Sequence, residues 1–308
     1  MSRFVRHYLL ALQFFTRLPV TGRLAAWVGY SPQMLRASAA HFPGVGWLVG
    51  LLVAALSAVL LLALPKGTFS PLIVASIGTA FGILLTGAFH EDGLADVADG
   101  LGGSYQRERA LDIMKDSRVG AFGAIAIALA LLVKVALVAQ LASMGLDVLC
   151  ASLFLAHVVS RTWPLLLIRL LPHVGDTAAS KSKPLADQIT AGALVVAGLW
   201  CAGAVLLVNG LPGAVPGGLL QWLPQWLHSA PTLVAPLVPT PLVPELLAQR
   251  WMAAQLGALA ASALAFAWMG RWFARRLQGF TGDCLGATQQ ICELAFYLGF
   301  LLGWGAYT

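Results

Sequence analysis

The sequence predicts an all-α fold, a polytopic helical bundle embedded in a membrane. Of the 308 residues, 59% are hydrophobic and only 10% are charged, and the mean hydropathy is +0.81. Soluble domains are about 25% charged, so this composition excludes a soluble globular enzyme. Several apolar stretches approach the roughly 20 residues that a helix needs to cross a bilayer. We therefore expect one membrane-embedded domain over residues 1–308.

Seven apolar segments qualify as spans by length and composition. They cover residues 44–64, 71–90, 119–144, 148–171, 189–209, 250–269 and 287–306. The N-terminal stretch carries arginines on both sides of a short apolar run and lacks a clear cleavage site, which predicts a retained interfacial helix. Eight prolines exclude a regular span across 210–249, which we expect on the non-cytoplasmic side.

The distribution of basic residues predicts the orientation of these spans. The formal net charge is +6, but lysines and arginines stand singly at the ends of apolar stretches, which is a topology signal rather than a nucleic-acid footprint. They gather before the first span and in alternate connections. We therefore expect a protein of the cytoplasmic (inner) membrane, surrounded by lipid, with the N-terminus and segment 91–118 cytoplasmic and without a nucleic-acid partner. The sequence leaves a homo-oligomer open.

Acidic residues are concentrated in one connection. Of 13 acidic residues, seven lie between positions 91 and 116: Glu91, Asp92, Asp96, Asp99, Glu108, Asp112 and Asp116. On a helix continuing from the second span, the spacing of Asp92, Asp96 and Asp99 directs all three into one sector. Glu91 points about 100° away and is a weaker ligand. Because neighbouring carboxylates repel unless a cation lies between them, we predict a Mg²⁺ site here.

A second acidic register follows the first. Glu108, Asp112 and Asp116 repeat at helical spacing in a short helix leading into the third span, which would place two acidic faces across one ion site. Lys115, Ser117 and Arg118 adjoin Asp116 and are suitable donors for phosphate oxygens. Carboxylates for a metal beside cations for phosphate indicate phosphoryl or nucleotidyl transfer. The alternative is a merely solvated loop, which the concentration of carboxylates at a membrane boundary disfavours.

Two further connections on the same face are polar. One contains Lys181, and the other contains Thr281, Gly282 and Asp283 directly before the last span. Both are candidates to close over an anionic substrate, because backbone N–H groups at a helix start bind phosphate well. An ordinary polar connection is the alternative for each.

Four ionisable residues lie within the predicted spans. Such groups usually face a cavity or one another. We expect Arg161 and Glu293 to face a pocket, and Lys134 and Arg169 to extend their charged ends to the interface. His90, which adjoins the acidic run, is expected to assist the site.

Three motifs, taken in order, resemble a known family. They are HEDGLADVADG at 90–100, MKDSRVG at 114–120 and TGDCLGA at 281–287, supported by LQFFTRLP at 12–19 and HFPGVG at 41–46. Together they resemble the signatures of the cobalamin synthase family, the adenosylcobinamide-GDP ribazoletransferases, over nearly the whole chain. Glu91 stands where the family more often has an apolar residue, and the proline-rich segment is longer than usual.

The resemblance implies a Mg²⁺-dependent late step in building the lower ligand of vitamin B12. In it, the 5'-hydroxyl of α-ribazole, or α-ribazole 5'-phosphate, displaces GMP from adenosylcobinamide-GDP. Such a transfer requires positioning and charge stabilisation at phosphorus. We expect Asp92, Asp96, Asp99 and Asp116 to bind the metal, and Asp116, Asp99, Lys115 and Arg118 to be catalytic. The expected substrate-binding residues are Ser117, Arg161, Lys181, Thr281, Gly282 and Asp283.

Two other functions remain open from the sequence. Asp96-x-x-Asp99-Gly100 followed by Asp112-x-x-x-Asp116 partly matches the CDP-alcohol phosphotransferases, although their Ala-Arg is missing and the gap between the aspartate pairs is too short. An ion-coupled transporter would use the same carboxylates for coupling ions. It would need acids near the bilayer midplane, whereas the acidic run here lies at a membrane boundary.

Overall fold

The computed structural model describes residues 2–175, 189–210 and 244–306, and the regular elements in these ranges are all helices. Apart from one isolated bridge between His173 and Phe280, no strand pairing occurs in the described ranges. The predicted all-α class is therefore confirmed.

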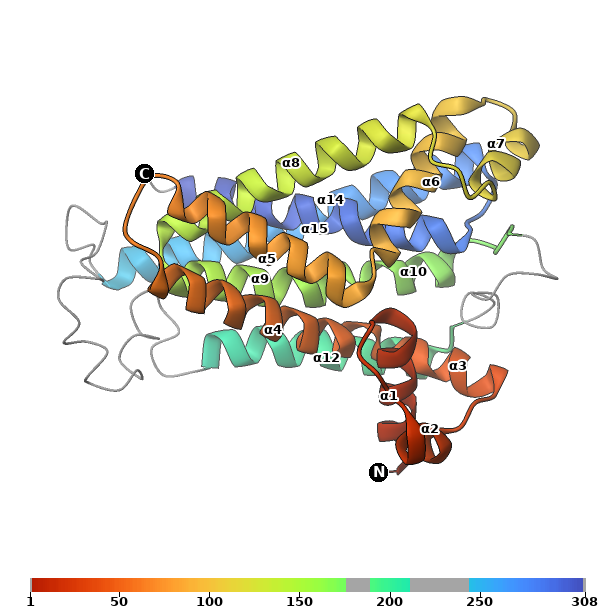
Figure 1. Cartoon of the computed structure of the whole chain (residues 1–308), viewed down its shortest axis with the longest axis horizontal. Helices are drawn as coiled ribbons and strands as arrows, with labels where there is room; N and C mark the ends of the chain where they lie inside the picture. Colours follow the sequence, from red (N-terminus) through yellow and green to blue (C-terminus); the bar gives the residue numbers. More distant parts are fainter. Residues whose placement is uncertain (1, 176–188, 211–243, 307–308) are drawn as a thin grey trace.

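Six helical spans are long and apolar enough to cross a membrane, and they run side by side along the molecule (Figure 1). A seventh is added if the bent pair α5 (Ser70–Thr86) and α6 (Phe89–Gly103) counts as one span. The number of predicted spans is thus confirmed. The six are formed by α4 (Phe42–Ala63), α8 (Ala121–Met144), α9 (Leu146–Ser160) with α10 (Trp163–Leu170), α12 (Ala191–Gly210), α14 (Pro244–Arg276) and α15 (Gly282–Gly305).

Helix α14 is longer than the sequence predicted. It contains 33 residues and begins at Pro244, whereas the predicted span began at residue 250. A proline is compatible with the first turn of a helix, because the N–H it lacks has no intrahelical partner there. The rest of the proline-rich segment, residues 211–243, lies outside the described residues.

The chain turns sharply between α5 and α6. Gly87 and Ala88 both adopt the left-handed conformation, with φ of 67° and 58°, and the two helices meet at 89°. The prediction that the acidic helix continues from the second span is therefore wrong. A glycine in this conformation is a common helix terminator, and here it ends α5 so that α6 runs across the end of the bundle (Figure 1).

The expected N-terminal helix is present as α1 (Ser2–Phe15), followed by the short helices α2 (Gly22–Val28) and α3 (Pro32–Ser38). Together with α6 and α7 (Arg107–Met114), these helices lie at one end of the bundle, which we call the polar end (Figure 1). The last helix, α15, ends at the opposite end of the bundle, as an odd number of spans requires.

Helix α15 connects the middle of the bundle to the polar end. It packs closely against α14, where a Cβ on Gly257 would lie 2.5 Å from the carbonyl oxygen of Gly299. Small residues allow such close approach of helices in membranes. The first turn of α15 packs against α6, so this helix sets the position of the polar end relative to the core.

Candidate active site

Four aspartates form a carboxylate cluster at the polar end: Asp92, Asp96 and Asp99 of α6, and Asp283 in the first turn of α15. Asp92 is exposed, Asp96 and Asp283 are half-buried and Asp99 is buried. The negative charges of the other three act on Asp96, with Asp283 the strongest. Within the described ranges, no lysine or arginine forms an ion pair with Asp92, Asp96 or Asp283. The described residues therefore leave the negative charge of this cluster without a paired cation.

A close helix contact brings the two parts of the cluster together. A Cβ on Gly93 would lie 2.7 Å from the carbonyl oxygen of Asp283, so only glycine lets α6 approach α15 this closely. Gly286 allows the same approach one turn further along α15, beside the backbone of His90. The motifs at 90–100 and 281–287 therefore meet in space, although nearly 190 residues separate them.

Asp99 has a role that the sequence did not reveal. Its two carboxylate oxygens accept hydrogen bonds from the backbone N–H groups of Gly120 and Gly123, at 2.7 and 2.8 Å. These groups belong to the start of α8, where unpaired N–H groups and the positive end of the helix dipole favour an anion. Asp99 thus ties α6 to α8 and joins the first motif to the second. Its assignment as a metal ligand and catalytic residue remains a prediction.

Asp116 lies outside the carboxylate cluster. The prediction that it shares a helix with Glu108 and Asp112 is wrong, because α7 ends at Met114. Asp116 instead accepts hydrogen bonds from the backbone and guanidinium of Arg118, the shortest at 2.7 Å, in a local turn. These bonds lower the pKa of Asp116 to about 2. Two acidic helix faces across one ion site are therefore not formed.

The remaining polar candidates of the second motif lie on the exposed connection between α7 and α8. Lys115, Ser117 and Arg118 are all exposed there, and Arg118 is paired with Asp116. Lys181 lies outside the described residues. The structure thus places the predicted phosphate donors of this motif near the polar end without bringing them into the carboxylate cluster.

The third motif forms the start of α15. Thr281 occupies the position before the helix, and its hydroxyl donates to Asp283 Oδ2 at 3.2 Å. Gly282 is the first helical residue, as the sequence predicted for a segment that opens directly into a span. Thr281 therefore orients a carboxylate of the cluster, and the free N–H groups of the first turn lie beside it.

Arg161 is buried between α9 and α10, with 2% of its surface exposed. Its Nη1 donates to the carbonyl oxygen of His157 at 2.9 Å, and the guanidinium lies 5.9 Å from the centre of the Phe42 ring. The carboxylates of Glu293 and, less strongly, Glu91 act on it electrostatically. Arg161 is therefore enclosed within the bundle but lines neither described cavity, and its contact with substrate remains a prediction.

Glu91 and Gln290 are residues whose role sequence reasoning missed. Glu91 is buried and accepts a hydrogen bond from Gln290 Nε2 at 2.9 Å, which links α6 to α15. Gln290 in turn donates to Gln289 Oε1 at 3.0 Å. Two adjacent amides within an apolar span were the available signal, because such groups require partners inside a membrane.

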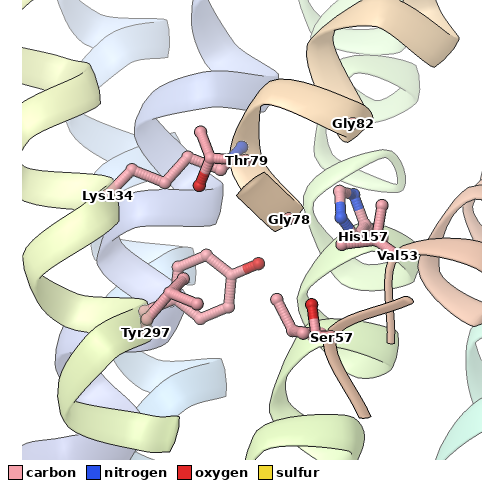
Figure 2. Close-up of a pocket in the computed structure, with 10 residues that line it drawn as sticks. Val53, Ser57, Gly78, Thr79, Gly82, Lys134, His157 and Tyr297 are labelled. Carbon is pink, nitrogen blue, oxygen red and sulfur yellow. The ribbon is translucent and has the colours of Figure 1, made fainter. Parts of the chain in front are cut away.

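A second polar group of residues, the interior network, lies deeper in the bundle and comprises Lys134, His157, Gln289, Glu293 and Tyr297. Glu293 pairs with Lys134 at 2.8 Å and accepts hydrogen bonds from Tyr297 at 3.0 Å and Gln289 at 2.8 Å. The predicted snorkelling of Lys134 is therefore wrong, because the Glu293 carboxylate holds its charge inside. A cavity of about 10 Å³ adjoins the network, lined also by Ser57 and Thr79, which is room for roughly one water molecule (Figure 2).

The carboxylate cluster fits a hard divalent cation by its chemistry. Carboxylate oxygens are the preferred ligands of Mg²⁺, and no cation of the described chain offsets the charge around Asp96. Among the described residues, no three acidic, histidine or cysteine side chains already converge on one metal position. Mg²⁺ typically takes only one or two carboxylates and completes its shell with water and substrate phosphate, so this arrangement suits it.

Comparison with known proteins gives a consistent result. The family model for cobalamin-5-phosphate synthase matches residues 7–301. An adenosylcobinamide-GDP ribazoletransferase of Albidiferax ferrireducens is 61% identical over 98% of this chain and 100% of its own length. The enzyme of the same name from Polaromonas naphthalenivorans is 54% identical over 97% of this chain and 98% of its own length. That of Vibrio cholerae is 37% identical over 94% of this chain and 91% of its own length. No solved structure matches the chain. The chain belongs to the cobalamin-5-phosphate synthase family.

Proposed function

We propose that the chain is an adenosylcobinamide-GDP ribazoletransferase that acts late in cobalamin biosynthesis, with the carboxylate cluster as its catalytic centre. The family match and the named relatives support the activity. The contact between α6 and α15 brings the first and third motifs together, and this observation supports placing the catalytic centre there. Since the site draws on residues from 92 to 283, we treat residues 1–308 as one catalytic domain.

The reaction forms one bond at phosphorus and breaks another. A ribose hydroxyl of α-ribazole attacks the phosphorus attached to the cobinamide, the anhydride bond breaks, and GMP leaves with the bridging oxygen. The expectation that the 5'-hydroxyl attacks needs correction. A product named cobalamin-5-phosphate keeps a phosphate at that position, so an enzyme that accepts the phosphorylated acceptor must use a ring hydroxyl of the ribose.

The residues proposed to hold Mg²⁺ are Asp92 and Asp96, with Asp283 beside them. Asp99 stabilises their arrangement through its bonds to the start of α8. When bound there, the cation supplies positive charge against the phosphate oxygens and the charge that develops on the leaving GMP. Thr281 keeps Asp283 oriented, and the first turn of α15 offers backbone N–H groups to phosphate.

The proposed diphosphate contacts come from the connection between α7 and α8. Lys115, Ser117 and Arg118 are exposed there and present donors of the kind that phosphate oxygens accept. Lys181 is proposed as a further contact. Arg161, which is buried behind the ring of Phe42, would contribute through its positive charge rather than by direct contact.

Asp116 has two roles open to it from the sequence, a metal ligand or the acceptor of the ribazole proton. Its pKa of about 2 makes it a weak base at neutral pH. We therefore favour a role as an ionised carboxylate that holds and orients Arg118.

The polar end is proposed to face the cytoplasm, with the chain in the cytoplasmic membrane. Basic residues gather at this end, which the positive-inside rule assigns to the cytoplasmic side. They include Arg3, Arg6, Arg17, Arg107, Arg109 and Arg276.

A Tyr105→Cys variant tests this orientation, with the labelling of the wild-type chain as the control. An impermeant thiol reagent should label the variant in inverted vesicles and not in intact spheroplasts.

GMP release tests the function directly. Detergent-purified protein is given adenosylcobinamide-GDP and α-ribazole, with and without Mg²⁺, and GMP and the corrinoid product are quantified. Metal-dependent GMP release with a cobalamin product is the expected result. Folded protein that releases no GMP, or that releases CMP from CDP-activated alcohols instead, would overturn the proposal.

A further inference from the structure

A small aromatic pocket lies at the polar end where α1, α4, α6, α10 and α15 meet. Its walls include the rings of Phe14, Phe15, Phe42 and Phe89, together with His90. Phe15 stacks on Phe42 with ring centres 4.1 Å apart, and Phe42 stacks on His90 at 5.7 Å with the planes 13° apart. The pocket is therefore built of parallel and perpendicular aromatic faces, which suit a planar aromatic ligand.

One side chain that lines this pocket has a ring nitrogen without a partner. His90 is 1% exposed, and its Nε2 forms no hydrogen bond within the described chain. A buried ring nitrogen without a partner costs free energy, so it marks a position where a ligand atom would be stabilised. The remaining lining is almost entirely apolar. The pocket therefore offers one unpartnered side-chain nitrogen, the backbone of Gly282 at the start of α15, and several aromatic surfaces.

The pocket adjoins the carboxylate cluster across the α6–α15 contact. Gly282 and Gly286 of α15 line it, and Gly282 is the direct neighbour of Asp283. A Cβ on Gly286 would lie 3.2 Å from the carbonyl oxygen of His90, so α6 and α15 are in close contact between the two sites. A ligand in the pocket would thus present whatever is attached to its ring to the cluster.

We propose that this pocket binds the benzimidazole-type base of the ribazole acceptor, with His90 Nε2–H donating to the free ring nitrogen of the base. This inference rests on the proposed function. A benzimidazole joined to ribose through one nitrogen keeps a single unsubstituted ring nitrogen, which matches the one unpartnered side-chain nitrogen among the lining residues. Guanine, the other aromatic base among the substrates, presents several donors and acceptors that this pocket would leave unpaired.

Binding requires the pocket to widen. The cavity measures about 20 Å³, which is smaller than a fused bicyclic ring. Its outer wall is formed by Phe14, which is half-buried, and by Phe89, which is 37% exposed. The proposal requires these two rings, which α1 and α6 carry, to rotate outward, while α4 and α15 keep their positions. Phe15 and Phe42 are buried and remain as the inner stacking surface.

The test is a set of variants measured with each substrate separately. His90→Leu should raise the KM for α-ribazole about tenfold, as expected for one lost hydrogen bond, and leave the KM for adenosylcobinamide-GDP unchanged. His90→Gln, which keeps an N–H donor, should recover part of the affinity. Phe89→Ala should also raise the KM for α-ribazole. The matched control is Phe69→Ala, since Phe69 is 72% exposed and directly precedes α5, which begins at the other end of the bundle.

An analogue of α-ribazole isolates the hydrogen bond itself. In an indole riboside, a C–H group replaces the free ring nitrogen. Wild-type protein should bind it about tenfold more weakly than α-ribazole, whereas His90→Leu should bind both alike. The inference would be overturned if His90→Leu still bound α-ribazole more tightly than the indole riboside. It would also be overturned if His90→Leu raised the KM values for α-ribazole and adenosylcobinamide-GDP equally. Calorimetric titration with α-ribazole alone separates the two proposals, because it reports the pocket even if no GMP is released.

Discussion

The interior network and the carboxylate cluster hold acidic groups in opposite ways. Glu293 is 1% exposed, and its carboxylate is paired with Lys134 and accepts hydrogen bonds from Tyr297 and Gln289. Asp96 is half-buried, and the charges that act on it are other carboxylates. A buried carboxylate with a structural role is usually paired with a cation of the same protein, as Glu293 is with Lys134. Among the described residues no paired cation offsets the charge of the carboxylate cluster, which is why we propose this cluster, and not the interior network, as the metal site.

Removal of divalent metal is expected to have the largest effect. If the cluster needs a cation, a chelator should abolish GMP release, and added Mg²⁺ should restore it. The interior network contains its own cation, so chelation should leave the melting temperature of substrate-free protein nearly unchanged. GMP release that persists at full rate after chelation would contradict the proposal that the carboxylate cluster, unlike the interior network, needs an added cation.

Asp96→Asn is the next test. We expect kcat to fall on the order of 10³-fold, because a charge at the reaction centre is removed. Stability should stay the same or rise, since a repelled charge is lost. Asp112→Asn, on the exposed face of α7, is the matched control and should leave both quantities unchanged. An active Asp96→Asn protein would remove Asp96 from the metal site.

Glu293→Gln should lower the stability of the protein rather than its kcat, the reverse of Asp96→Asn. It leaves the buried ammonium of Lys134 without its counter-charge, which should lower the free energy of unfolding by about 3 kcal/mol. Thermal unfolding in detergent measures this. The double variant Lys134→Met with Glu293→Leu should recover most of the loss, because both charges are then absent. A large fall in kcat of a fully folded Glu293→Gln protein would place Glu293 in the reaction instead.

Asp116→Asn is expected to have the smallest effect. The side chain is exposed and acts through Arg118, so a loss of about tenfold in kcat/KM is expected, typical of a residue that orients another. Steady-state kinetics with both substrates measures it. A loss as large as that of Asp96→Asn would show that Asp116 joins the carboxylate cluster during turnover.

The spans were predictable because their cause is local. A segment in lipid must satisfy its own backbone hydrogen bonds, so length and hydropathy identify it without knowledge of its neighbours. The same reasoning placed the acidic residues at one end, and helical spacing brought Asp92, Asp96 and Asp99 together on α6.

The features that escaped prediction depend on neighbours. The pairing of Lys134 with Glu293 depends on how α8 and α15 are rotated against each other, which hydropathy does not encode. The bonds from Asp99 to the start of α8 depend on where that helix begins. The turn at Gly87 and Ala88 required two consecutive left-handed residues, and alanine gives no signal for that conformation.

The two bonds that Asp99 makes to the start of α8 close a loop in the chain. Asp99 and Gly120 lie 21 positions apart in sequence but are joined at 2.7 Å, so the segment between them is anchored at both ends. An anchored segment has fewer conformations to lose than a free one of the same length. If Lys115 and Arg118 bind the diphosphate as proposed, the segment that carries them would do so with part of its conformational entropy already lost during folding, which would favour binding.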